Sequence, residues 1–85
     1  MTAKKIKFSG IDVIDEVKQI VAISTVCKHD IDVVSGRYVV DAKSIMGWFS
    51  LDLSMPLTIM IHAEEADCAD TLARLEKFIE NGNGK

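Results

Sequence analysis

Two runs of β-branched residues around one short turn signal constrain this chain more than any other local pattern. Residues 31–34 and 37–40 are typical of strands, and Ser35-Gly36 between them supplies a glycine for the positive φ of a tight hairpin turn. An isolated hairpin is only marginally stable in water, so these strands need further strands or a helix to pack against. The hairpin therefore predicts a sheet that the rest of the chain must complete.

The remaining apolar patterns predict two more strands and three helices. Asp12 or Asp15 is available as the N-cap of the first helix, whose apolar residues follow helical spacing from Val17 onward. In chain order, we expect a strand at 3–8, a helix ending near 28–29, the hairpin, a short helix within 41–53, a strand at 57–62 and a helix at 64–80 that ends at Asn81-Gly82.

This order of elements predicts an α+β fold with one antiparallel sheet and its helices gathered on one face. A chain of 85 residues has room for one domain. We expect that domain to span residues 1–82, with residues 83–85 as a flexible tail.

Charge and composition exclude several classes of function. The net charge is −3 and the ten Lys and Arg residues are spread along the chain, so the clustered basic face of a nucleic-acid-binding protein is missing. No apolar run approaches the roughly 18 residues of a membrane helix, and residues 1–8 lack the apolar stretch of a signal peptide, so we expect no membrane partner and a cytoplasmic location. Cys27 and Cys68 have no metal-ligand spacing and are expected to be reduced thiols, with neither metal nor cofactor bound.

The short predicted helix carries the most informative motif. It opens with Lys43-Ser44-Ile45-Met46-Gly47, followed by an aromatic pair and Ser50-Leu51. This segment closely resembles the region around the regulatory serine of HPr, the phosphocarrier of the bacterial sugar phosphotransferase system. The runs at 28–33 and 66–67 are similar to further parts of that family, and the resemblance covers nearly the whole chain. It implies an HPr-like open-faced sandwich, a four-stranded antiparallel sheet covered on one face by three helices in the order β-α-β-β-α-β-α.

The chain departs from this family at the phosphoacceptor site. In the family, the acceptor histidine lies in a Gly-hydrophobic-His-Ala-Arg-Pro run just before the first helix. Counting back without a gap from Lys28 puts Asp15 at the histidine, Val17 at the arginine and Lys18 at the proline. The carboxylates of Asp15 and Glu16 would repel a docking anion, by about 1 kcal/mol at 4 Å in water and by about 4 kcal/mol at an effective dielectric of 20. The resemblance therefore implies a divergent member without histidine phosphocarrier chemistry.

Three roles remain open for Asp15. It can serve as an N-cap or first-turn charge, which stabilises a helix by about 1 kcal/mol. It can also present a fixed negative charge that imitates a phosphorylated family member to a partner. Formation of an acyl phosphate is a third role, although no metal-binding acidic cluster or assisting lysine surrounds it.

Ser44 has two interpretations. A serine that opens a helix is an ordinary N-cap. The resemblance adds a second role, since a bacterial kinase and phosphorylase acting on HPr modifies this serine in the family. A phosphate adds about −1.5 to −2 charges and is tolerated at a helix N-terminus, so it would change recognition without unfolding the helix.

The apolar side chains of the short helix predict a surface for protein partners, because they cannot all face inward from so short an element. In the family, the outward members of this segment combine with the first helix to form the docking surface. The expected partner-binding residues are Ile20, Ser24, Ile45, Met46, Trp48 and Phe49, with Trp48 as the anchor.

These observations predict an HPr-like binding and regulatory module of the phosphotransferase system that is not an enzyme. Its expected partners are proteins of that system or a transcription regulator, with an HPr kinase acting on Ser44. One alternative is an atypical phosphocarrier that accepts phosphate at Asp15, His29 or His62, although both histidines are expected to be structural. Another alternative is a structural domain that self-associates through Trp48 and Phe49, so we expect a monomer or a weak dimer.

Overall fold

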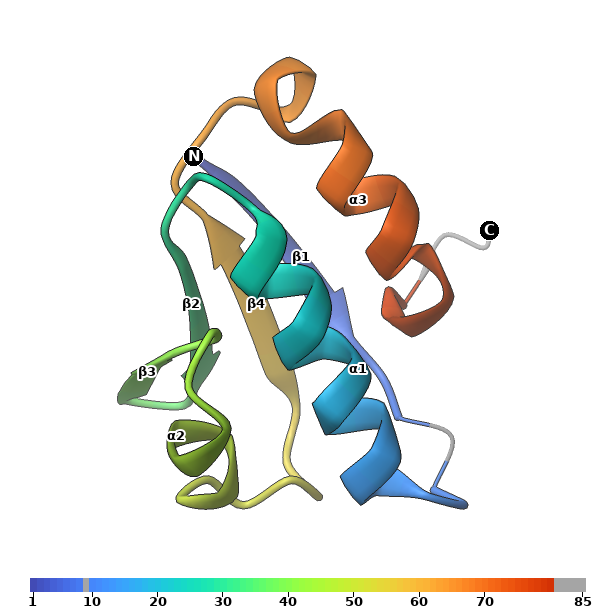
Figure 1. Ribbon diagram of the computed structural model, residues 1–85. Coiled ribbons are helices and arrows are strands. Elements are labelled where there is room, and N and C mark those ends of the chain that lie inside the picture. Colours follow the sequence, from blue (N-terminus) through green and yellow to red (C-terminus); the bar gives the residue numbers. More distant parts are fainter. Residues whose placement is uncertain (9, 81–85) are drawn as a thin grey trace.

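The computed structural model describes residues 1–8 and 10–80, which form one four-stranded sheet with three α-helices (Figure 1). The strands are all antiparallel and lie in the order β1-β4-β2-β3. This architecture confirms the predicted α+β fold. The elements are β1 (Thr2–Ile6), α1 (Val13–Val26), β2 (Ile31–Ser35), β3 (Tyr38–Asp41), α2 (Ile45–Phe49), β4 (Leu57–Ile61), the 3-10 helix η1 (Glu65–Cys68), α3 (Ala69–Leu75) and the 3-10 helix η2 (Glu76–Phe78).

The predicted hairpin joins β2 to β3 through a two-residue turn. Ser35 pairs with Tyr38, so the turn consists of Gly36 and Arg37. Gly36 has a φ of +59°, the left-handed conformation that a type II′ turn requires at its first central position. Such a turn matches the twist of the flanking strands, which explains why this short sequence closes the hairpin.

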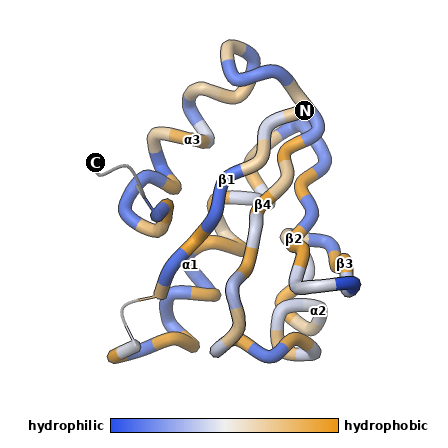
Figure 2. The backbone as a smooth tube through the Cα atoms, turned by 180° about the vertical axis from the view of Figure 1, so that it is seen from behind, coloured by the Kyte–Doolittle hydropathy of each residue, from blue (hydrophilic) through white to orange (hydrophobic). Residues whose placement is uncertain are grey.

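The core lies between the sheet and the helices. Alternate residues of the central strands are buried: Ile31 and Val33 on β2, and Leu57, Ile59 and Ile61 on β4. Full burial of one such side chain contributes about 1.5–3 kcal/mol. α1 and α3 cover this face in Figure 1, and Figure 2 shows the sheet from the other side, with the strands in front of α1.

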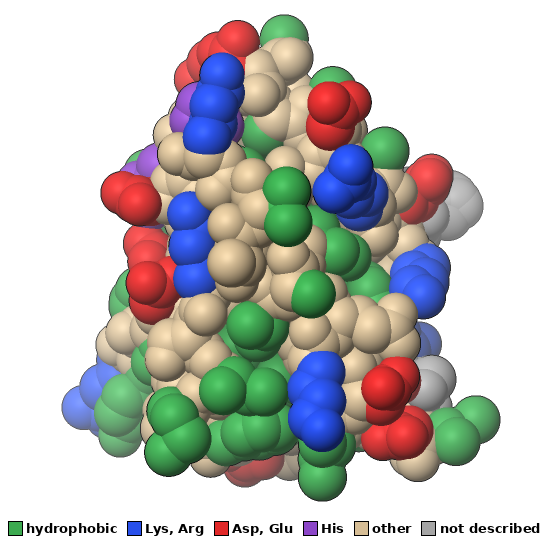
Figure 3. Space-filling model, in the orientation of Figure 1, with side chains coloured by type: hydrophobic (Ala, Val, Ile, Leu, Met, Phe, Trp, Pro, Cys, Tyr) green, Lys and Arg blue, Asp and Glu red, His purple; other side chains and the backbone are tan. Residues whose placement is uncertain are grey.

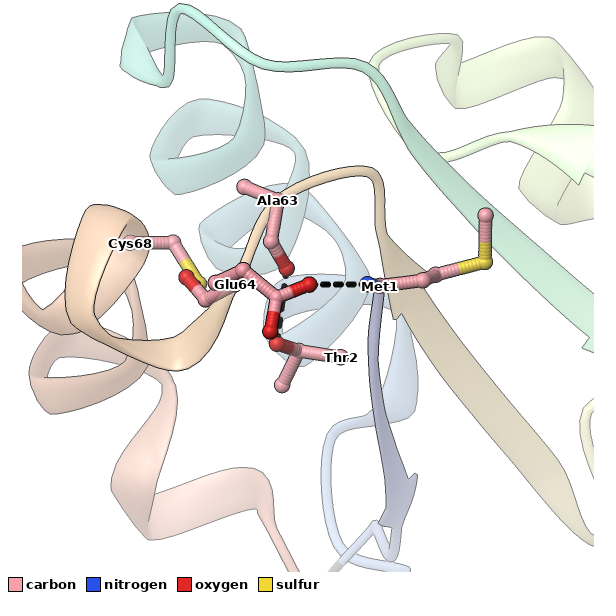
Figure 4. Close-up of polar contacts among 5 residues, drawn as sticks. All are labelled: Met1, Thr2, Ala63, Glu64 and Cys68. Carbon is pink, nitrogen blue, oxygen red and sulfur yellow. Dashed lines mark hydrogen bonds and ion pairs between the residues drawn. The ribbon is translucent and has the colours of Figure 1, made fainter.

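The start of β1 is tied to the connection between β4 and η1 (Figure 4). The ammonium group of Met1 lies 3.0 Å from Oε2 of Glu64, and the Thr2 hydroxyl donates to the carbonyl oxygen of Ala63 at 2.8 Å. The Cys68 thiol donates to the carbonyl oxygen of Glu64 at 3.4 Å. The contacts of Met1 and Thr2 hold the start of β1 beside the end of β4.

The chain from Phe78 to Glu80 covers the outer edge of β1 at its C-terminal end. The N–H of Lys7 donates to the carbonyl oxygen of Phe78 at 2.8 Å, and the N–H of Glu80 donates to that of Lys5 at 2.9 Å. Ile79, between them, is extended, with φ −81° and ψ 131°. The predicted helix at 64–80 therefore ends at Phe78, because the residues beyond it pair with a strand.

Other boundaries also differ from the prediction. The C-terminal helix is divided into η1, α3 and η2, and β1 ends at Ile6, two residues earlier than expected. α1 ends at Val26. The predictions for the helix end at Asn81-Gly82 and for the tail at 83–85 lie outside the described residues.

Candidate functional site

Carboxylates occupy the N-terminus of α1. Asp12 is the N-cap: its Oδ1 accepts a hydrogen bond from the N–H of Asp15 at 3.0 Å, and its carbonyl oxygen accepts one from the N–H of Glu16 at 3.0 Å. Oδ2 of Asp15 accepts a further bond from Nε2 of Gln19 at 2.6 Å. Negative side chains in the first turn interact favourably with the helix dipole. These acids therefore stabilise the helix start.

The residue directly before α1 is Asp12, not Asp15. The helix begins at Val13, so Asp15 lies inside its first turn, three residues after the N-cap Asp12. Val17, at the counted position of the family arginine, is completely buried and carries no charge. Both candidate acceptor positions hold a carboxylate, so the expected repulsion of a phosphoryl group does not depend on which of them is equivalent to the histidine.

The two histidines of the chain lie far from this helix end. His29 follows the C-terminus of α1, whose 14 residues span about 21 Å. Its Nε2 is buried and has no hydrogen-bond partner among residues 1–8 and 10–80. His62 follows β4, which ends at the top of the sheet in Figure 1, whereas α1 begins at the bottom. Its Nε2 lies 2.7 Å from Oδ2 of Asp32 and links the end of β4 to β2.

Ser44 is the N-cap of α2. Its Oγ accepts a hydrogen bond from the N–H of Gly47 at 3.2 Å, and its own N–H donates to the carbonyl oxygen of Asp41 at 3.0 Å. The side chain remains partly exposed. Lys43 fixes the approach to this helix, because its Nζ donates to the carbonyl oxygen of Cys27 at the end of α1, at 2.9 Å.

Trp48 does not belong to the surface that the sequence analysis assigned to it. Its side chain is completely buried, and its Nε1 donates to the carbonyl oxygen of Ala42 at 2.9 Å. Phe8 packs edge-on against the indole, with the ring centroids 6.3 Å apart. The prediction that Trp48 anchors a partner or a second copy is therefore wrong: the residue fixes α2 to the core.

Ile20 and Ser24 are also misplaced in the predicted docking surface. Both are completely buried on the face of α1 that packs against the sheet. The Oγ atom of Ser24 has no hydrogen-bond partner among the described residues. Neither side chain can contact a partner without movement of α1, so the surface must be made of other residues.

A group of exposed apolar side chains does exist at this end of the molecule. From the predicted set, Met46 is 77% exposed and Phe49 is 43% exposed, while Ile45 is partly buried against the core. The start of α1, α2 and the segment before β4 lie together at the bottom of Figure 1, where Figure 3 shows apolar side chains gathered on the surface. We define the apolar end as the exposed members of these segments: Ile11, Ile14, Met46, Phe49 and Met55.

Sequence reasoning missed Ile11, Ile14 and Met55. Ile14 lies three residues before the buried Val17, a spacing that makes the two side chains neighbours on the helix, yet Ile14 is 58% exposed at the margin of the buried stripe, so its exposure had no signal in the apolar periodicity. Ile11 and Met55 lie in connections, where apolar periodicity carries no information.

Neither a metal centre nor a membrane span is evident in the part of the chain that the structure describes. Within it, no three His, Cys, Asp or Glu side chains are arranged to hold a metal ion. The helices there are also too short or too polar to cross a bilayer.

One carboxyl group near the apolar end has a shifted pKa. Hydrogen bonds from the Ser54 hydroxyl and N–H lower the pKa of Asp52.

One comparison with known proteins bears on this arrangement. A sequence model of the family described as "PTS HPr component phosphorylation site" matches residues 5–81, which is most of the chain. No curated protein is significantly similar to the sequence. The family match spans both the carboxylate-capped start of α1 and the Ser44 cap of α2.

Proposed function

The chain belongs to the HPr family of the phosphotransferase system, and we propose that it works there as a binding and regulatory module instead of a histidine phosphocarrier. HPr proteins are phosphocarriers and not enzymes, so no catalytic activity of its own is assigned to the chain. One observation carries the proposal. The start of α1 is capped by Asp12, with Asp15 beside it, and both histidines lie elsewhere.

The proposal follows from what phosphoryl transfer to histidine needs. The acceptor must be a neutral imidazole, and free helix amides with a cation must receive the phosphoryl oxygens. Here Asp12 already accepts the hydrogen bond of the Asp15 amide. The position counted for the family's arginine holds Val17, which is buried and uncharged. A phosphoryl group would meet two carboxylates, each repelling it by about 1 to 4 kcal/mol at 4 Å, depending on the local dielectric.

Labelled phosphoenolpyruvate with the first enzyme of the phosphotransferase system tests this half of the proposal. We expect no stable label on the chain, while a histidine-bearing HPr in the same reaction becomes labelled. Acid-labile label on His29 or His62, or hydroxylamine-sensitive label on Asp15, would contradict the proposal and favour the atypical phosphocarrier.

The apolar end supports the binding half of the proposal. Exposed apolar clusters commonly mark protein interfaces, and this one lies beside the Ser44 cap on α2. The proposed occupant is another protein of the phosphotransferase system. Replacement of Phe49 by Ser is expected to weaken that complex at least about tenfold, equivalent to about 1.4 kcal/mol, in titration calorimetry.

Val26 offers a matched control for the apolar end. It is 71% exposed, but it lies at the opposite end of α1. Val26→Ser is expected to leave the complex unchanged. Equal weakening by Val26→Ser and Phe49→Ser would show that the apolar end is not the interface.

Phosphorylation of Ser44 is the proposed regulatory step. The hydroxyl is partly exposed and next to the apolar end, so a phosphate there would add about −1.5 to −2 charges at the border of the interface. Incubation with ATP and an HPr kinase, followed by mass spectrometry, is expected to place phosphate on Ser44 and to give no product with Ser44→Ala. An unmodified Ser44 would remove the regulatory half and leave the binding half standing.

A further inference from the structure

The two edges of the sheet differ in how they are protected. The outer edge of β1 is covered at its C-terminal end by the chain from Phe78 to Glu80, through bonds from Lys7 to Phe78 and from Glu80 to Lys5. β3 is the other edge, and within the described residues no strand pairs with its outer side. An uncovered edge strand presents main-chain groups that readily pair with another strand.

The main-chain groups of Val39 point out of this edge. The N–H of Ala42 donates to the carbonyl oxygen of Ile31 at 2.9 Å, so these two residues form a hydrogen-bonded pair. Bonded and non-bonded pairs alternate along an antiparallel ladder. Val40 is therefore bonded to β2, whereas Val39 and Asp41 direct their N–H groups away from it.

The charges at the two ends of β3 are complementary. Val39 and Asp41 share one side of the strand because they are two residues apart, and Arg37, the second residue of the turn, directly precedes the strand. A second β3 placed antiparallel and centred on Val39 would put Arg37 opposite Asp41 of the second copy, and Asp41 opposite Arg37. Within the described residues Arg37 makes no ion pair, so its charge is available to this partner.

We propose that two copies of this chain associate through β3 about a two-fold axis at Val39, which joins the two sheets into one. Each Val39 donates its N–H to the carbonyl oxygen of the other Val39, and two Arg37–Asp41 pairs flank the axis. Tyr38 and Val39 contribute apolar contact, since they are 66% and 58% exposed in the single chain. This inference does not depend on the proposed function.

Neighbouring elements leave the edge open. α2 packs over the flat side of β3, where a Cβ added to Gly47 would lie 3.2 Å from Cβ of Val40. The helix therefore covers a face of the strand and leaves its edge free. β3 has only four residues, so the interface is small and a weak, concentration-dependent dimer is expected, because interfaces below about 1,000 Å² are typically transient.

Sedimentation velocity over a wide concentration range tests the dimer by charge exchange. The unmodified chain is expected to dimerise as its concentration rises. Arg37→Asp and Asp41→Arg each place like charges opposite one another, and each is expected to weaken association at least about tenfold. The double variant restores opposite charges across the axis and is expected to restore the dimer, although it keeps any local effect of both changes.

Several results would overturn the proposal. If the unmodified chain stays monomeric at every concentration tested, or if the dimer persists in Arg37→Asp, the result contradicts the proposal. A folded double variant that does not dimerise would also contradict it. Loss of the dimer in Phe49→Ser, with Arg37→Asp unaffected, would assign self-association to the apolar end instead. Circular dichroism of each variant confirms that it is folded.

A cysteine at the axis gives an independent test. Facing residues of a hydrogen-bonded antiparallel pair have Cα atoms about 5.5 Å apart, within the range of roughly 4.4–6.8 Å that a disulfide spans. Val39→Cys is expected to form a disulfide-linked dimer under mild oxidation. Lys5→Cys, exposed on the strand at the other edge, is the control and is expected to give far less; equal cross-linking of the two variants would contradict the β3 dimer.

Discussion

The indole of Trp48 donates a hydrogen bond to the carbonyl oxygen of Ala42 across 2.9 Å, and both residues are completely buried. Ala42 directly follows β3, whereas Trp48 lies in α2. The bond therefore holds the short helix against the end of the hairpin. A five-residue helix has little stability of its own, so this contact and the burial of the indole explain why α2 keeps its place.

Trp48→Phe is expected to lower the free energy of unfolding by about 2–3 kcal/mol, because it leaves a buried carbonyl oxygen without its donor and creates a small cavity. Urea unfolding followed by circular dichroism measures this loss. Met46→Ala, on the exposed side of the same helix, is expected to change the free energy by less than about 0.5 kcal/mol. Similar losses in the two variants would be incompatible with a buried indole.

Asp12→Ala is expected to destabilise the protein by about 0.5–2 kcal/mol, because the N–H of Asp15 loses its acceptor. For a chain of this size, each kcal/mol lowers the melting temperature by about 4–8 °C, which calorimetry resolves. Asp12→Ser preserves a capping oxygen and should retain most of the stability. If Asp12→Ser melts as low as Asp12→Ala, capping is not the cause.

Ser44→Ala is expected to lower the free energy of unfolding by about 1 kcal/mol. It should also speed amide hydrogen exchange at Gly47, whose N–H loses its bond to the Ser44 oxygen. Ser44→Asp keeps an acceptor at the N-cap and adds negative charge there, so exchange at Gly47 should stay slow. Unchanged exchange at Gly47 in Ser44→Ala would show that the hydroxyl is not the cap.

The lowered pKa of Asp52 predicts a small loss of protein stability in acid. Its folded pKa is lowered, first by the Ser54 hydroxyl and then by the Ser54 N–H. Its stabilising contribution is therefore fully present above the ordinary value of 3.8 and is lost as the pH falls through the lower folded value. Ser54→Ala removes the hydroxyl bond and should raise the pKa of Asp52, as seen in a carbon-detected NMR titration. A pKa that does not rise would contradict this cause.

Local features of this protein could be predicted because their causes lie within a few residues. Gly36 allows the turn between two β-branched strands, Ser44 accepts the bond of an amide three residues ahead, and the buried residues of β2 and β4 alternate. The resemblance at residues 43–47 made it possible to predict the whole fold, and both the structure and the family match support that fold.

The composition of the candidate surface could not be predicted in the same way. Trp48, Ile20 and Ser24 were expected outside but are buried, while Ile14 and Met55 are exposed. Apolar character alone does not distinguish a core residue from an interface residue. That distinction depends on which side of each helix meets the sheet.

The sequence alone was enough to predict the order of the elements, the hairpin, the capped short helix and the acids at the start of the first helix. These follow from backbone preferences and from short-range hydrogen bonds, which act between neighbours in the chain. The packed structure was needed to show that Trp48 anchors α2, that residues 78–80 cover the C-terminal end of β1, and that no described strand pairs with the outer edge of β3. These depend on contacts between residues distant in the chain, because burial and edge pairing exist only once the helices and strands have packed together.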